Sequence, residues 1–300
     1  MEEKNVRPLT PFYGGAAFSV NVIFYLLVSL AASGIIAACS LGGSDGAKYI
    51  SLLVSPVAIA ITALVFFRVT RAPVRSILPV KTKPKYYLIG ILLIFGLLFS
   101  LNSLNDLLVK LFEMMGYERR ASYLPSFSGW NIIPALIVIA IIPAIAEEIL
   151  FRGIILNGSE KGVGSWLCVV FVGLCFSLYH GTVEQTVYQF ICGCLFALLA
   201  VRSRSVAPSV FIHFLNNAVI IILTACSCTD AVTGELLLPL AADITLTVLS
   251  ALSLIGAVVW LVLDKTEMKK REAGGVKNFF IGASVGIIVM VILWVANLFV

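Results

Sequence analysis

The chain has 300 residues, of which 60% are hydrophobic and 12% are charged, and its formal net charge is +5. Its mean hydropathy is +1.04. A soluble globular domain is about 25% charged, so this composition excludes that class and indicates an all-α membrane protein. Long apolar runs joined by short basic loops also argue against a β-barrel, whose strands alternate polar and apolar residues. Because topology accounts for the lysines and arginines beside these runs, the net charge predicts no nucleic-acid partner.

About 20 apolar residues are needed to cross a bilayer as a helix. On that basis the apolar segments lie near 16–39, 49–67, 86–105, 131–156, 165–181, 186–201, 206–225, 240–263 and 278–300. We predict a polytopic transmembrane helical bundle of roughly eight to nine spans, forming a single integral membrane domain over residues 1–300. The 7 cysteines lack the two-residue spacing of zinc or redox motifs and are interpreted as packing residues.

The densest basic cluster follows the second apolar segment and consists of Arg68, Arg71, Arg75, Lys81, Lys83 and Lys85. By the positive-inside rule this loop faces the cytoplasm. The same orientation puts the N-terminus, the loops at Lys161 and at Arg202 and Arg204, and residues 264–277 on the cytoplasmic side. Three basic residues on the opposite side fit this orientation less well: Lys110, Arg119 and Arg120. We therefore expect a multi-pass protein of the plasma membrane with its basic loops in the cytoplasm.

The fourth apolar segment contains PAIAEEILFRG, from Pro143 to Gly153, which brings two glutamates and an arginine into the bilayer. Ionisable groups at that depth are costly and usually functional. Residues four apart share a helix face, so Glu148 and Arg152 are predicted to pair, whereas Glu147 points elsewhere and can meet a cavity. Pro143 removes a backbone hydrogen bond and can bend the helix beside this site.

Two later segments bring the chain's 2 histidines into a similar setting: FSLYH, ending at His180, and HFLNN, running from His213 to Asn217. With a rise of about 1.5 Å per residue, these groups and Glu147 all reach one layer near mid-membrane. Polar residues placed there for unrelated structural reasons would not be expected to lie at the same depth in the membrane. We therefore predict a single site within a catalytic core at residues 130–225.

These side chains fit the chemistry of a hydrolase. A desolvated carboxylate and a neutral imidazole, Glu147 and His180, could together hold and deprotonate a water molecule. His213 and Asn217 supply hydrogen-bond donors on one helix face, as the oxyanion of a tetrahedral intermediate requires. Serine and cysteine nucleophiles are less favoured, because the sequence contains no G-x-S-x-G elbow.

The order Glu-Glu-x-x-x-Arg, Phe-x-x-x-His, His-x-x-x-Asn on successive membrane helices resembles the three signature motifs of the CPBP family of intramembrane proteases. This family, also known as CAAX proteases and bacteriocin-processing enzymes or the Abi family, includes the Ras-converting enzyme. The resemblance covers roughly residues 130 to 225. It implies a glutamate-dependent endopeptidase that needs no metal or other cofactor. Its partners would be a peptide or membrane-anchored protein substrate and the lipid bilayer.

The resemblance also implies a role for each matching residue. Glu147 and His180 would activate the water, and His213 and Asn217 would form the oxyanion hole. Three further side chains would support the site: Glu148, Arg152 and Phe176.

Three alternatives stay open. Glu147, His180 and His213 could form the His/His/Glu set of a zinc metalloprotease, although no H-E-x-x-H motif is present. The same groups could act as the relay of a proton-coupled transporter. A non-catalytic membrane partner or immunity protein would need none of this chemistry. For an endopeptidase the substrate is also open among prenylated CAAX-type tails, leader peptides and other membrane-anchored proteins.

Overall fold

The computed structural model describes residues 9–118, 124–229 and 236–298. Its helical elements are α1 (Pro11–Ala38), α2 (Asp45–Thr70), α3 (Val74–Ile77), α4 (Lys85–Met114), η1 (Gly129–Asn131), α5 (Ile132–Ala135), η2 (Leu136–Ile141), α6 (Ile142–Glu148), η3 (Ile149–Leu156), α7 (Asn157–Val163), α8 (Ser165–His180), α9 (Thr186–Ser203), α10 (Ala207–Ala225), α11 (Leu240–Leu263) and α12 (Gly275–Ala296). Within the described residues, strand-like pairing is limited to an isolated bridge between Thr229 and Leu236. The predicted all-α fold is confirmed.

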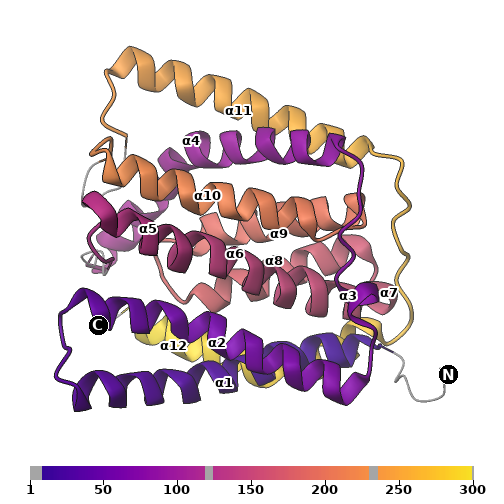
Figure 1. Cartoon of the computed structure of the whole chain (residues 1–300). Coiled ribbons are helices and arrows are strands. Elements are labelled where there is room, and N and C mark those ends of the chain that lie inside the picture. Colours follow the sequence, from indigo (N-terminus) through magenta and orange to yellow (C-terminus); the bar gives the residue numbers. More distant parts are fainter. Residues whose placement is uncertain (1–8, 119–123, 230–235, 299–300) are drawn as a thin grey trace.

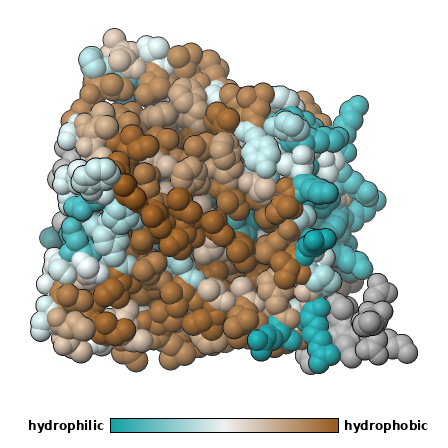
Figure 2. Space-filling model, viewed as in Figure 1, coloured by the Kyte–Doolittle hydropathy of each residue, from teal (hydrophilic) through white to brown (hydrophobic). Residues whose placement is uncertain are grey.

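The described helices include 7 that are long and apolar enough to cross a membrane: Pro11–Ala38, Asp45–Thr70, Gly129–Val163, Thr186–Ser203, Ala207–Ala225, Leu240–Leu263 and Gly275–Ala296. Two shorter apolar helices are Lys85–Leu101 and Ser165–His180. Together these stretches are roughly consistent with the eight to nine spans expected from the sequence. Large apolar side chains stand on the outside of the bundle, and Figure 2 shows them as a broad apolar surface. An apolar surface of this extent marks an integral membrane protein.

The long helices lie nearly side by side in the view of Figure 1, where α1, α2 and α12 form one side of the bundle and α4 and α11 the other. The segment from η1 to α10 lies between these two groups. Glycines bring α1 and α12 into close contact, since a Cβ on Gly15 would lie 2.1 Å from the carbonyl oxygen of Phe279. Small residues serve the same purpose at many membrane helix interfaces.

Because successive long helices alternate in direction, the connections gather at two ends of the bundle. We call one the basic end, formed by residues 71–84, 163–165, 203–206 and 264–274. We call the other the far end, formed by residues 39–44, 115–118, 124–128, 181–185, 226–229 and 236–239. Contacts between connections support both groups: Val206 donates its backbone N–H to Pro79, and the side chain of Asn297 donates to the carbonyl of Gly181.

The element that carries PAIAEEILFRG is longer than the span expected at 131–156, because the structure continues it from Gly129 to Val163. Its last turns, NGSEKGV, are polar and contain two glycines, which predicted a loop. Instead they pack against α1, where Gly14 has no side chain to clash with Ser159: a Cβ there would lie 2.0 Å from the Ser159 hydroxyl oxygen. This tertiary contact overrides the local sequence preference.

Ion pairs with buried carboxylates hold the connection formed by residues 264–274 in place at the basic end. The carboxylate of Glu160 is 1% exposed and pairs with Lys269 at 2.6 Å and with Arg204 at 3.0 Å. Asp264 accepts hydrogen bonds from Lys85 and from the hydroxyl group of Tyr86. Burial alone would raise the pKa of Asp264, but the hydrogen bonds from Lys85 and Thr266 outweigh it and hold this pKa well below its ordinary value.

This depressed pKa predicts an acid-sensitive contribution to stability. A carboxylate with a lowered folded-state pKa contributes stability that is fully present above its unfolded pKa of about 3.9 and is lost progressively as the pH falls from there through the folded-state pKa. We expect Asp264→Asn to lower the Tm in detergent at pH 7 by about 2–4 °C, the shift for about 1 kcal/mol. At about pH 3 the Tm difference should be smaller than at pH 7, and it should vanish only when the pH reaches the lowered folded-state pKa. An equal Tm difference at both pH values would contradict the prediction.

Candidate active site

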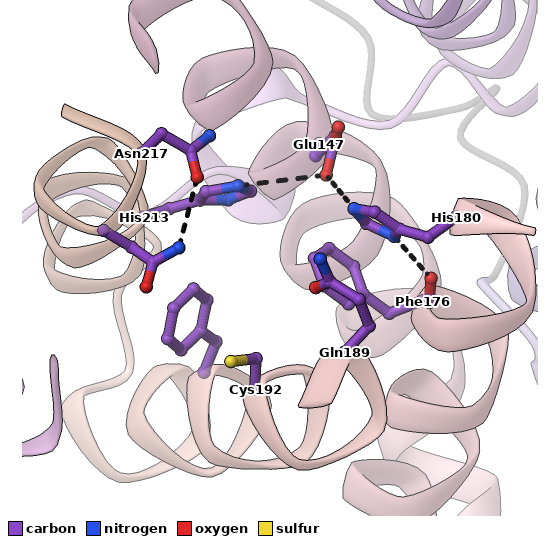
Figure 3. A pocket seen from close by; sticks show the side chains of 9 residues that line it. Glu147, Phe176, His180, Gln189, Cys192, His213 and Asn217 are labelled. Carbon is purple, nitrogen blue, oxygen red and sulfur yellow. Dashed lines mark hydrogen bonds and ion pairs between the residues drawn. The ribbon is translucent and has the colours of Figure 1, made fainter. Parts of the chain in front are cut away.

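The three sequence motifs meet in the interior of the bundle, at the positions shown in Figure 3. Glu147 comes from the C-terminal end of α6, His180 is the last residue of α8, and His213 lies in the second turn of α10. The Oε2 atom of Glu147 is 3.9 Å from Nε2 of His180 and 3.9 Å from Nε2 of His213. These separations exceed the range of about 2.7–3.2 Å for a direct hydrogen bond. A water molecule beside the three atoms can bridge polar groups at this distance. Oε2 is buried and has no hydrogen-bond partner within the described part of the protein.

The orientation of His180 is fixed by the end of its own helix. Gly181 adopts a left-handed conformation at φ 64° and terminates α8 directly after the histidine. The Nδ1 atom of His180 lies 2.9 Å from the carbonyl oxygen of Phe176. Since a carbonyl can only accept, Nδ1 carries the hydrogen and Nε2 of the neutral ring is left with a lone pair facing Glu147. The backbone of Phe176 therefore selects the tautomer.

His213 is oriented by Glu148, a contact that the sequence did not indicate. Its Nδ1 atom lies 2.9 Å from Oε1 of Glu148. The same carboxylate oxygen accepts from Nη1 of Arg152 at 2.7 Å, and the side chains of Glu148 and Arg152 are both fully buried. Glu148 thus contacts the predicted arginine and one of the histidines, because α10 packs against α6.

Arg152 is held by a second helix and by aromatic rings. Its Nη2 atom donates to the carbonyl oxygen of Gly193 at 3.2 Å. The guanidinium carbon lies 4.6 Å from the ring centre of Phe176 and 5.3 Å from that of Phe196, distances typical of cation–π contacts. The close approach of α8 and α9 needs glycine, since a Cβ on Gly193 would lie 2.8 Å from Cα of Gly173.

Asn217 is held by a carbonyl that a proline leaves available. Its Nδ2 atom donates to the carbonyl oxygen of Ile139 at 3.0 Å. In an α-helix this carbonyl would accept from residue 143, but Pro143 has no N–H to donate. Two π-helical segments, η2 and η3, flank α6 at this point, and such irregular turns often accompany functional sites.

A series of hydrogen bonds from Tyr188 through Asn216 orients the side-chain oxygen of Asn217. Tyr188 donates its hydroxyl hydrogen to Oδ1 of Asn216 at 3.0 Å. Asn216 in turn donates from Nδ2 to Oδ1 of Asn217 at 3.2 Å. With its oxygen already accepting, Asn217 keeps its second amide hydrogen for a group in the cavity.

These side chains enclose a cavity of about 50 Å³. A cavity needs only about 10–15 Å³ on this measure to hold one water molecule, so the space suits one or a few waters beside Glu147. The cavity is lined by Glu147, Phe176, His180, Gln189, Cys192, Phe196, His213, Asn216 and Asn217. All four predicted catalytic residues are among them, and the predicted supporting pair, Glu148 and Arg152, lies directly behind.

Sequence reasoning missed the residues that α9 contributes. Tyr188, Gln189, Cys192 and Phe196 belong to none of the three motifs, and ordinary side chains of these types occur in many membrane helices. Asn216 of α10 does carry a sequence signal, because it stands beside Asn217 in HFLNN. Within the described residues, the grouping of Glu147 and the two histidines does not have the arrangement of a metal site.

Comparison with known proteins supports the motif assignment. Residues 129–219 match the family model described as type II CAAX prenyl endopeptidase Rce1-like. No curated protein and no solved structure matches the chain. The matched residues include all three motifs and every residue that lines the cavity. The match over residues 129–219 supports assigning this part of the chain to the CPBP family of CAAX-type proteases, which are membrane-embedded peptide hydrolases.

Proposed function

We propose that this protein is an intramembrane endopeptidase in which Glu147 and His180 activate a water molecule for attack on a peptide bond. One observation carries the proposal: the buried, unpartnered Oε2 of Glu147 lies 3.9 Å from Nε2 of each histidine. With His180 hydrogen-bonded through Nδ1, its Nε2 atom and Oε2 of Glu147 are two acceptor atoms that face one point. A water molecule there would supply the two O–H donors that such a point lacks.

In the proposed reaction, Glu147 removes one proton from this water while His180 accepts a hydrogen bond from the other O–H. The hydroxide attacks the carbonyl carbon of the scissile bond and gives a tetrahedral intermediate. When the carbon–nitrogen bond breaks, the proton held by Glu147 passes to the leaving nitrogen. The products are a new carboxyl terminus and a new amino terminus, with the atoms of one water added.

The oxyanion of the intermediate would be stabilised by Asn217 and His213. Asn217 has one amide hydrogen left after donating to Ile139. His213 already donates from Nδ1 to Glu148, so it can donate from Nε2 only as the doubly protonated ring. Nδ1 of that ring lies 2.9 Å from a carboxylate oxygen of Glu148, whose negative charge would balance the protonated ring. Glu148 and Arg152 are thus positioning residues, and residues 130–225 form the proposed catalytic core.

Replacing His180 tests its role in this mechanism. We expect His180→Ala to lower cleavage by about 10²-fold, because the water that Glu147 deprotonates would lose the hydrogen bond that positions it. The side chain is 22% exposed and stands at a helix end, so folding should be retained. The measurement is a comparison of membrane peptidomes from cells that express the variant or wild type. Thr182→Ala, in the exposed turn after α8, is the matched control and should cleave normally. Normal product levels with His180→Ala would refute its role.

A chelator experiment separates this mechanism from the zinc alternative. If Glu147 acts as a base without a metal ion, purified enzyme should keep its activity after prolonged treatment with EDTA and phenanthroline. A zinc enzyme using Glu147, His180 and His213 would lose activity and regain it with added zinc. Inhibition that zinc reverses would overturn the metal-free mechanism and leave the proteolytic function in place.

A further inference from the structure

The two ends of the bundle differ strongly in charge. Figure 2 shows hydrophilic side chains gathered most densely at the end where Figure 1 shows the N-terminus, α3 and α7. Most of the 21 lysines and arginines of the sequence lie at or beside this basic end: Arg68, Arg71, Arg75, Lys81, Lys83, Lys85, Lys161, Arg202, Arg204, Lys265, Lys269, Lys270, Arg271 and Lys277. Near the far end, the described residues include Lys48 of α2 and Lys110 of α4, while Arg119 and Arg120 lie outside the described residues. By the positive-inside rule the basic end is cytoplasmic.

The active site lies toward the far end of the α8–α9 hairpin. α8 starts at the basic end and finishes at His180, and α9 starts at Thr186 and returns. The turn between them reaches the far end of α12, where Asn297 donates to the carbonyl of Gly181 at 2.8 Å. With 22 residues, α12 rises about 33 Å from the basic end to this level.

Exposure rises toward the far end along each helix of the cavity. On α8, Phe176 is 1% exposed and the side chain of His180 is 22% exposed. On α9, which runs the other way, Phe196 and Cys192 are buried whereas Gln189, near the far end, is half-buried. On α10, His213 is buried and Asn217, one turn nearer the far end, is half-buried. Three helices therefore agree on the direction of the opening.

On the cytoplasmic side, the cavity is closed by a layer of large buried side chains. Arg152 stands at its centre, fully buried and paired with Glu148. The rings of Phe151, Phe176 and Phe196 surround its guanidinium group at 4.6–5.9 Å. Each of these rings is at most 1% exposed, so this layer blocks the direct path through the bundle interior from the basic end.

We infer that the catalytic cavity opens on the extracytoplasmic face of the membrane, and that its substrates are polypeptide segments presented from that face. The substrate class is thus an exported peptide or an outward-facing segment of a membrane-anchored protein, rather than a cytoplasmic tail. The statement about substrates rests on the proposed function. The direction of the opening stands on the exposure and charge of the described residues.

Thiol labelling tests the opening without requiring catalysis. The starting variant replaces the exposed cysteines Cys39, Cys226 and Cys228 with serine. Gln189→Cys then places a thiol at the cavity rim, and Arg75→Cys places one at the basic end. The probe is a membrane-impermeant methanethiosulfonate carrying a trimethylammonium group. It is applied separately to intact cells and to sealed inside-out vesicles, with the starting variant as background.

We expect Gln189→Cys to be modified in intact cells and protected in inside-out vesicles, with the opposite result for Arg75→Cys. Gln185→Cys, in the exposed turn before α9, gives a second far-end position if Gln189→Cys does not fold. Modification of both Gln189→Cys and Arg75→Cys only in inside-out vesicles would overturn the direction of the opening. Modification of Arg75→Cys in intact cells would overturn the orientation. Protection of both far-end thiols on both faces would overturn access altogether.

The proposed function can fail separately from this inference. Peptides that depend on Glu147 should map to extracytoplasmic segments when membrane and secreted peptidomes of wild type and Glu147→Gln are compared. Peptides that map to cytoplasmic segments would contradict the substrate class while supporting proteolysis. Outward labelling together with full activity in Glu147→Gln would leave the opening intact and refute the mechanism.

Discussion

Glu147→Gln is expected to lower proteolysis by about 10²–10⁴-fold, because an amide at this position cannot take a proton from the water. Glutamine has almost the same shape as glutamate, and the Oε2 position has no protein partner to lose within the described residues. The variant should therefore insert and fold like wild type, with an equal or slightly higher Tm, since a buried charge is removed. The measurement is product formation by mass spectrometry together with thermal unfolding in the same detergent.

Glu184→Gln serves as the control for removing a carboxylate nearby. Glu184 lies in the turn after α8 and accepts a hydrogen bond from Tyr117, outside the catalytic cavity. It should cleave at a rate close to wild type. Equal activity in Glu147→Gln and wild type would reject Glu147 as the base. Equal loss in both variants would indicate a general requirement for negative charge at this end of the bundle.

Arg152→Ala is expected to lower both stability and activity. The substitution leaves Glu148 as an uncompensated charge that is fully buried, and breaking such a pair typically costs about 3–5 kcal/mol. A loss of 3 kcal/mol corresponds to a fall in Tm of roughly 6–12 °C. It also removes the guanidinium group that lies between three aromatic rings. The measurement is thermal unfolding in detergent, and an unchanged Tm would contradict the prediction.

The double variant Glu148→Gln with Arg152→Ala separates charge balance from positioning. Because it leaves no unpaired charge, it should regain a substantial part of the lost stability. Activity should stay low, since His213 would no longer face a carboxylate at 2.9 Å. Recovery of activity together with stability would mean that Glu148 acts only as the partner of Arg152.

The sequence predicted which side chains gather around the cavity better than it predicted the hydrogen bonds between their helices. Helical spacing alone indicated the pairing of Glu148 and Arg152 and separated Glu147 from both, because these relations lie within one helix. The contact of Glu148 with His213 joins residues 65 positions apart and depends on how α6 and α10 pack. No pattern local to either helix could reveal it. The shared depth of the motifs was predictable, because rise per residue is nearly constant.

Boundaries and irregular turns were predicted less well than the helices themselves. Residues 157–163 continue the central helix because Gly14 of α1 leaves space for Ser159, and Gly162 leaves space for Pro11. The two π-helical segments beside Glu147 have no distinct sequence pattern apart from Pro143. α9 supplies Tyr188 and Gln189 to the site through its position alone, and that position follows from its packing on α8. Each of these features depends on tertiary contacts that overrule local preference.

Main-chain carbonyls hold several of the groups at the catalytic centre. His180 is bonded to the carbonyl of residue 176, Arg152 to that of residue 193 and Asn217 to that of residue 139. Any amino acid supplies such a carbonyl, so the side chain at position 139 is free to vary without disturbing Asn217. Inserting or deleting one residue is different, because it rotates every later carbonyl on the helix by about 100°. The protein should therefore tolerate changes of residue identity around its centre but not changes in length within η2, α8 and α9.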